Sequence, residues 1–121
     1  MIRDGRYYYG LGLESYESGN FEEALRCLLK SAELQKHFKT FELLYESYSA
    51  VGDEYEAKKC IAQAFALSSG NSKVATKFSK MLLRENQREQ AKEVLQSVIF
   101  KNPTYGPARE LLRFLDSEGN S

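Results

Sequence analysis

A short segment near the start of the chain returns twice at an almost constant spacing. Residues 18–34 read SGNFEEALRCLLKSAEL, and the same skeleton recurs as GDEYEAKKCIAQAFAL at residues 52–67 and as NQREQAKEVLQSVIFK at residues 86–101. Gly19, Gly52 and Asn86 hold the same slot, with spacings of 33 and 34 residues. Such a period is typical of a helical repeat array, in which each unit buries its apolar face against its neighbours.

The composition agrees with an all-helical chain. At 121 residues and 42% hydrophobic residues, the chain is expected to fold as a single domain over residues 1–121. β-Branched residues are sparse, which argues against strands. The two prolines, Pro103 and Pro107, lie near the C-terminus. Nearly everything before them can therefore be helical, because proline is the residue that most disrupts a helix.

The pattern predicts three helical hairpins followed by a seventh helix. The first hairpin has helices over residues 5–18 and about 21–35, with Gly19 ending the first helix and Asn20 capping the second. Later repeats follow the same plan, and Ser72 is expected to cap the first helix of the third repeat. A seventh helix over about residues 107–116 is expected to cover the last repeat with a solvated outer face, and residues 117–121 are expected to form a frayed tail.

Small residues mark where the helices of a hairpin approach closely. Gly12 lies one turn after Tyr8 in the first predicted helix. A glycine inside a helix costs about 1 kcal/mol relative to alanine. That cost is acceptable where a neighbouring helix must come close, and Ala24 and Ser31 supply equally small side chains on the second helix.

The residue types of each copy resemble those of the tetratricopeptide repeat, which has a fixed order of bulky, small and turn residues. The first copy supplies Tyr8, Leu11, Gly12, Gly19, Phe21, Ala24, Leu28 and Ser31. The second supplies Phe41, Leu44, Tyr45, Tyr48, Gly52, Ala57, Ile61 and Ala64, and the third supplies Phe78, Leu82, Ala91, Leu95, Val98 and Pro103. The chain departs from the family pattern in two ways: the first two copies lack the closing proline, and Ala75 replaces the first bulky residue of the third.

This resemblance implies an all-α fold, a right-handed α-solenoid of three helix-turn-helix hairpins plus a seventh capping helix. The repeats would cover about residues 5–37, 38–71 and 72–105. In this family the first helices of the hairpins line a concave groove. Carried onto this chain, the groove positions are Arg6, Tyr9, Leu13, Tyr16, Glu17, Lys39, Glu42, Glu46, Ser49, Lys73, Thr76, Lys80 and Arg84. The resemblance thus implies a groove that changes from aromatic, through acidic, to basic.

Net charge argues against a polyanionic partner. The chain carries 17 basic and 17 acidic residues, so bulk charge would not drive binding to nucleic acid or to an acidic membrane. The charge is unevenly distributed: residues 1–71 carry eight basic and eleven acidic residues, and residues 72–105 carry seven and three. The sequence has neither a signal-peptide pattern nor an apolar run of about 20 residues, which predicts a cytoplasmic protein or a soluble intracellular domain of a larger one.

The sequence offers little for catalysis. His37 is the single histidine, and it lies in a predicted loop with no cysteine or acidic partner at a recognisable spacing. Cys27 and Cys60 match no metal motif and are expected to be small buried residues. Within the run of three tyrosines at residues 7–9, Tyr8 is expected to belong to the core. We therefore expect no enzymatic activity, no metal and no cofactor.

The predicted function is a non-enzymatic adaptor, scaffold or chaperone-like module that binds a peptide or helix of another protein in the groove. An apolar side chain of the bound segment would lie near Tyr9 and Leu13, and an acidic group near Lys73 and Lys80. Two alternatives are an accessory interaction domain of a larger enzyme or signalling protein, and weak self-association through an exposed apolar end.

A third alternative is the clamp by which some members of the resembled family hold the C-terminal carboxylate of heat-shock chaperones. Lys73 and Lys77 fit its two basic positions in the third repeat. The other three positions hold Tyr9, Leu13 and Leu43, so the polar groups of the clamp are lost there. The sequence therefore gives this alternative the least support.

Overall fold

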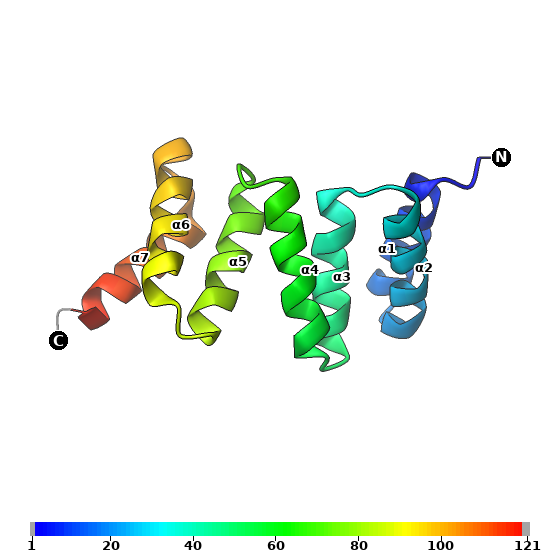
Figure 1. Cartoon of the computed structure of the whole chain (residues 1–121), viewed down its shortest axis with the longest axis horizontal. Coiled ribbons are helices and arrows are strands. Elements are labelled where there is room, and N and C mark those ends of the chain that lie inside the picture. Colours follow the sequence, from blue (N-terminus) through cyan, green and yellow to red (C-terminus); the bar gives the residue numbers. More distant parts are fainter. Residues whose placement is uncertain (1, 120–121) are drawn as a thin grey trace. The chain divides into compact units, whose positions relative to one another are not determined.

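The computed structural model describes residues 2–119, which form seven α-helices and no strand (Figure 1). The helices are α1 (Gly5–Glu17), α2 (Phe21–Leu34), α3 (Phe38–Ala50), α4 (Glu54–Leu67), α5 (Ser72–Arg84), α6 (Arg88–Lys101) and α7 (Gly106–Gly119). The chain divides into two compact units, Met1–Leu67 with α1–α4 and Ser68–Ser121 with α5–α7. The all-α prediction is confirmed. The grouping of residues 1–121 into one domain and the repeat boundaries remain predictions.

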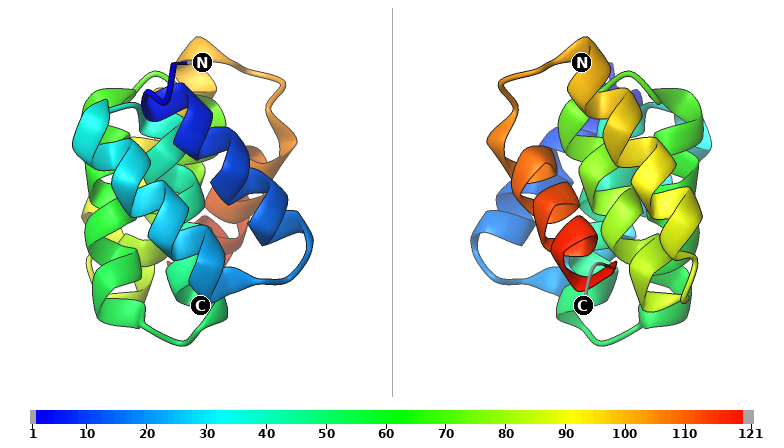
Figure 2. Two further views of the ribbon diagram at one scale, coloured as in Figure 1. Left: turned by 90° about the vertical axis from the view of Figure 1, so that its right-hand side faces the viewer. Right: turned by 90° about the vertical axis from the view of Figure 1, so that its left-hand side faces the viewer.

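The first unit consists of two helical hairpins packed on each other. Helix α1 packs on α2, α3 packs on α4, and α2 joins the two hairpins by packing on α3. Figure 2 shows α1 and α2 crossing side by side at the N-terminal end of the chain. The buried cluster at the centre of this unit consists of Ala24, Leu28, Leu43, Leu44 and Cys60. Burial of apolar side chains from both hairpins therefore holds the unit together.

The second unit is a hairpin of α5 and α6 that carries α7 on α6. Its buried apolar residues include Val74, Ala75, Leu82, Ala91, Leu95, Val98, Ala108 and Leu115. Polar contacts also attach α7 to α6. The Arg88 guanidinium donates to the Leu115 carbonyl oxygen at 2.5 Å and pairs with the Glu118 carboxylate at 3.1 Å, and the Lys92 ammonium lies 3.6 Å from the Asp116 carboxylate.

The turn inside each hairpin uses a left-handed residue at the repeated slot. Gly19 and Gly52 have φ of 81° and 83°, and Asn86 has φ of 61°. Glycine adopts this conformation freely, and asparagine is among the side chains that tolerate it best. The structure thus confirms the role that the sequence assigns to these three positions.

Two predictions about helix ends are wrong. Asn71, and not Ser72, caps α5: the Asn71 side-chain oxygen accepts from the Val74 amide at 3.0 Å, and Ser72 is already helical. Helix α7 runs over Gly106–Gly119 and is longer than the predicted 107–116. Residues 117–119, expected to belong to a frayed tail, continue this helix, and residues 120–121 lie outside the described part of the chain.

The two helices of the first hairpin approach each other closely at Gly12. A Cβ atom added to Gly12 would lie 2.6 Å from Cγ and 2.7 Å from Cδ2 of Leu28, a side chain with no exposed surface. Real Cβ atoms essentially never show so short a contact, so a side chain at position 12 would force Leu28 or the two helices to shift. This confirms the expectation that Gly12 permits close packing of the two helices.

Substitution of the two glycines of α1 tests this packing. We expect Gly12→Ala to lower the free energy of unfolding by about 1–3 kcal/mol, because overpacking against Leu28 outweighs the gain in helix propensity. Gly10→Ala is the matched control on the same helix, where an added Cβ meets no atom within 4 Å. It should raise the free energy of unfolding by about 0.5–1 kcal/mol. Urea unfolding followed by circular dichroism measures both, and effects of the same sign would contradict the packing.

Candidate functional site

Three of the residues predicted to line the groove meet in one pocket of the first unit. Arg6 and Tyr9 of α1 and Lys39 of α3 line a cavity of about 560 Å³. We call it the α1–α3 pocket. Its other lining residues are Asp4, Gly5, Ser31, Gln35, His37 and Thr40. The pocket therefore lies where α1 and α3 begin and α2 ends.

The floor of the α1–α3 pocket is polar and fixed. Ser31 and Thr40 are 1% and 2% exposed. The Ser31 hydroxyl donates to the Gly5 carbonyl oxygen at 2.6 Å, and its oxygen lies 3.4 Å from the Thr40 hydroxyl oxygen. Gly5 has no room for a side chain, since an added Cβ would lie 2.6 Å from Cβ of Gln35. These contacts hold the start of α1 against the end of α2.

Two helix caps form part of the pocket wall. The Asp4 carboxylate accepts from the Tyr7 amide at 3.0 Å and caps α1. His37 Nδ1 accepts from the Lys39 amide at 3.1 Å and caps α3, with its ring stacked on that of Phe38. The sequence identified His37 only as a solvated loop residue; it is exposed, but it also caps a helix. Its position just before an apolar helical run was the available signal, although histidine is not among the favoured capping residues.

The pocket presents two cations that are available to a ligand. The Arg6 and Lys39 side chains are exposed and make no hydrogen bond or ion pair with any other residue between positions 2 and 119. Asp4 is the one acidic side chain among the described lining residues, and it is engaged as a cap. An anionic group entering this pocket would therefore meet positive charge from two helices.

Tyr9 forms the apolar wall of the pocket and is half-buried. It packs against the central cluster of the first unit, as do Leu13 and Tyr16. Burial, followed by the negative charges of Glu42 and Glu17, raises the pKa of the Tyr9 phenol above its ordinary value of 10.0. Tyr9 thus stays protonated at neutral pH and can donate a hydrogen bond. The expectation that Tyr8 is the core tyrosine is wrong: Tyr8 is also half-buried, but it lines a different groove, between α1 and α2.

The other predicted groove residues lie on α3 and α5. Glu42 and Glu46 are half-buried, and they lie one turn apart on α3. In the second unit, Lys73, Lys77, Lys80 and Arg84 follow one another at spacings of four, three and four residues, which puts them on one face of α5. Thr76 does not join that face. It is buried, and its hydroxyl donates to the Ser72 carbonyl oxygen at 2.7 Å.

Neither a metal centre nor a membrane-spanning helix is found in the described part of the chain. Within residues 2–119, no group of three or more histidine, cysteine or acidic side chains is placed to hold a metal ion. None of the helices in the described part of the chain is both long and apolar enough to span a membrane.

The two cysteines differ in environment although they hold equivalent repeat positions. Cys60 is 8% exposed, as expected, whereas Cys27 is partly exposed and its thiol lies 3.7 Å from the Glu23 carboxylate. Burial and the nearby Glu56 raise the pKa of the Cys60 thiol to about 11 from its ordinary value of 9.0. Folding therefore favours the protonated thiol. The stability that the buried, protonated Cys60 contributes is fully present below about pH 9 and is lost as the pH rises through about 11.

Thiol labelling tests this difference. We expect iodoacetamide at neutral pH to modify Cys27 at least about tenfold faster than Cys60, because only a thiolate that the reagent can reach reacts. Mass spectrometry of proteolytic fragments measures the two rates. Cys27→Ser and Cys60→Ser variants assign the signals, and equal rates in the folded protein would contradict the burial of Cys60.

The comparisons with known proteins bear on the family and the fold. A family model described as "Tetratricopeptide repeat" matches residues 5–38. A comparison with curated protein sequences gives no match.

Solved structures of similar fold cover almost the whole chain. The first TPR of Spaghetti (RPAP3), bound to the HSP90 peptide SRMEEVD, has a TM-score of 0.81 at 18% identity, with 98% of each chain covered. The second TPR domain of human RPAP3, in complex with an HSP70 peptide, has a TM-score of 0.75 at 17% identity and covers 93% of this chain and 98% of that one. The Arabidopsis OM64 TPR domain has a TM-score of 0.78 at 10% identity and covers 94% and 95%.

At identities this low, the similarity to the solved structures shows the fold alone. The family match over residues 5–38 is a similarity in sequence. Both agree with the repeat pattern and with the left-handed turns at Gly19 and Gly52. Residues 5–38 therefore match the tetratricopeptide repeat in sequence, and the described chain has an all-α helical-repeat fold like that of the tetratricopeptide-repeat domains above.

Proposed function

We propose that this chain is a non-enzymatic protein-interaction module that binds a segment of another protein along the first helices of its repeats. The observation that carries the proposal is the α1–α3 pocket. Arg6, Tyr9 and Lys39, three positions assigned to ligand contact by the family resemblance, line one cavity there. A pocket that combines an aromatic wall with two available cations suits a peptide carrying a carboxylate next to an apolar side chain.

Charge and apolar contact would both contribute to the free energy of binding in such a complex. Arg6 offers a planar guanidinium that can hold a carboxylate by two hydrogen bonds, and Lys39 offers a point charge. Exposed ion pairs contribute only about 0.2–1 kcal/mol each, so charge alone would give weak binding. Apolar contact with Tyr9 and Leu13 would supply the rest of the binding free energy.

The second unit offers a further place for an acidic group. Lys73, Lys77, Lys80 and Arg84 share one face of α5, and three of them are exposed. This face supports the expectation that an acidic side chain of the partner lies near Lys73 and Lys80. The peptides bound by the two RPAP3 domains make acidic peptides the natural first probes for this chain.

A clamp for the C-terminal tails of chaperones has less support as the specific function. Lys73 and Lys77 lie one turn apart on α5, as such a clamp needs. The remaining clamp positions hold Tyr9, Leu13 and Leu43, and Leu43 is only 8% exposed in the central cluster. A buried leucine provides neither access nor a hydrogen-bond donor. An accessory interaction domain of a larger enzyme or signalling protein would use the same pocket, so the proposal covers that alternative too.

Selection from a random peptide library tests the proposal. We expect the wild-type chain to enrich peptides that contain an acidic residue beside an apolar one. In fluorescence anisotropy, Arg6→Glu/Lys39→Glu should raise the dissociation constant of an enriched peptide about tenfold or more, because two attractive charges become repulsive.

The matched control is Lys59→Glu. Lys59 is an exposed cation of α4 that pairs with Glu56 at 3.6 Å and does not line the pocket. This variant should leave the dissociation constant within about twofold. Equal affinity of all three proteins for every enriched peptide would contradict binding in the pocket.

A further inference from the structure

A second concave surface lies on the outer side of the first hairpin. It is an open groove of about 670 Å³ between α1 and α2, which we call the outer groove. Its lining residues are Tyr8, Leu11, Glu23, Arg26, Cys27, Leu29, Lys30 and Glu33. None of them lines the α1–α3 pocket. Tyr8, Leu11, Cys27 and Leu29 give the outer groove apolar surface, and Leu29 leaves 48% of its own surface exposed.

In the second repeat, a neighbouring helix covers the surface that is equivalent to the outer groove. Leu11 and Cys27 correspond to Leu44 and Cys60, which lie 33 residues later. In the second repeat these two positions are 1% and 8% exposed and share a buried cluster with Leu28 of α2. In the first repeat both remain partly exposed. The outer groove is therefore the uncovered counterpart of a face that α2 covers in the second repeat.

The exposed stripe of α2 along this groove has a self-complementary charge pattern. It consists of Arg26, Leu29 and Glu33, all exposed, at spacings of three and four residues, which keep them on one face of α2. The charges on the two sides of Leu29 have opposite signs. Two antiparallel copies centred on Leu29 would thus set Arg26 of each copy opposite Glu33 of the other.

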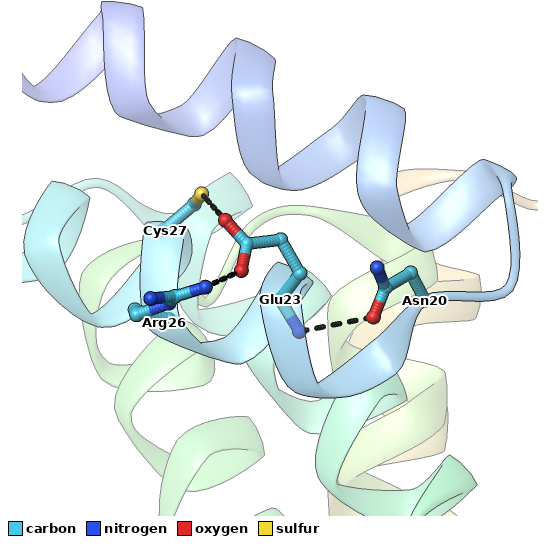
Figure 3. A network of polar contacts seen from close by, with 4 residues as sticks. All are labelled: Asn20, Glu23, Arg26 and Cys27. Carbon is cyan, nitrogen blue, oxygen red and sulfur yellow. Dashed lines mark hydrogen bonds and ion pairs between the residues drawn. The ribbon is translucent and has the colours of Figure 1, made fainter.

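The ion pairs that these residues make within one chain are open to exchange. Arg26 pairs with Glu23, whose carboxylate also accepts from the Cys27 thiol (Figure 3). Lys30 lies 3.8 Å from Glu33. The Arg26 side chain is 78% exposed and that of Glu33 is 72% exposed. Because exposed pairs along a helix contribute little, pairs across an interface that also buries Leu29 can replace them.

We propose that two copies of this chain associate through the outer groove, with their α2 helices antiparallel about a twofold axis at Leu29. The interface is isologous, so each copy uses the same patch: Leu29 meets Leu29, and two symmetric Arg26–Glu33 pairs form beside it. Tyr8 and Leu11 add apolar surface from α1. This association goes beyond the proposed function and leaves the residues of the α1–α3 pocket free for a ligand.

Sedimentation velocity over a range of concentrations at low ionic strength tests the proposal. The wild-type chain should change from monomer to dimer as its concentration rises. Arg26→Glu places like charges opposite each other twice in the dimer, so its dissociation constant should rise about tenfold or more. The double variant Arg26→Glu/Glu33→Arg restores both pairs with reversed polarity, and should return the constant to within about threefold of the wild-type value.

Lys59→Glu is the matched control for Arg26→Glu. Lys59 lies 33 residues after Arg26 and pairs with Glu56 three residues before it, as Arg26 pairs with Glu23. It should leave dimerisation unchanged. Circular dichroism establishes that each variant is folded. A wild-type chain that stays monomeric to millimolar concentration would overturn the proposal, and so would a double variant as weak as Arg26→Glu or an equal loss in Lys59→Glu.

Discussion

The close crossing of α1 and α2 at Gly12 and Leu28 is the contact on which the first unit depends. Leu28 fills the space that a side chain at position 12 would need, and Ala24, one turn earlier on α2, is equally buried. Leu28 also belongs to the cluster that holds the second hairpin through Leu43 and Leu44. A wider crossing would therefore loosen both the hairpin and the packing between repeats, and with it the wall of the α1–α3 pocket.

The residues of the repeats are of two kinds. Residues that recur in each repeat form the turns and the helix crossings, as Gly19 and Gly52 do with their positive φ angles. In the proposed function, residues that differ between repeats carry the specific chemistry of ligand binding. Arg6 and Lys39 hold equivalent positions in the first two repeats, yet it is the convergence of α1, α2 and α3 that puts them in one pocket with Tyr9. The outer groove arises differently, because Leu11 and Cys27 stay partly exposed whereas the equivalent Leu44 and Cys60 are buried beside Leu28 of α2.

The sequence predicted the helices well because the signals are local. The 33- and 34-residue period, the turn glycines and the apolar spacing each act within a few residues of the element that they define. The full set of pocket residues could not be predicted from the sequence, because the pocket floor depends on a hydrogen bond between Ser31 and Gly5, which are 26 residues apart. The capping role of His37 depends on the orientation of its ring. The different exposure of Cys27 and Cys60 depends on which neighbour each repeat has, and equivalent positions in a sequence do not carry that information.

The most direct test of this account is an NMR measurement on the isotope-labelled chain. Nuclear Overhauser effects between the Gly12 α-protons and the Leu28 methyl groups report the crossing of α1 and α2. We predict strong cross-peaks, because Leu28 Cδ2 lies within van der Waals reach of the Gly12 backbone. If these cross-peaks are absent while those within α1 and within α2 are present, the helices form without the crossing, and the account of the first unit is contradicted.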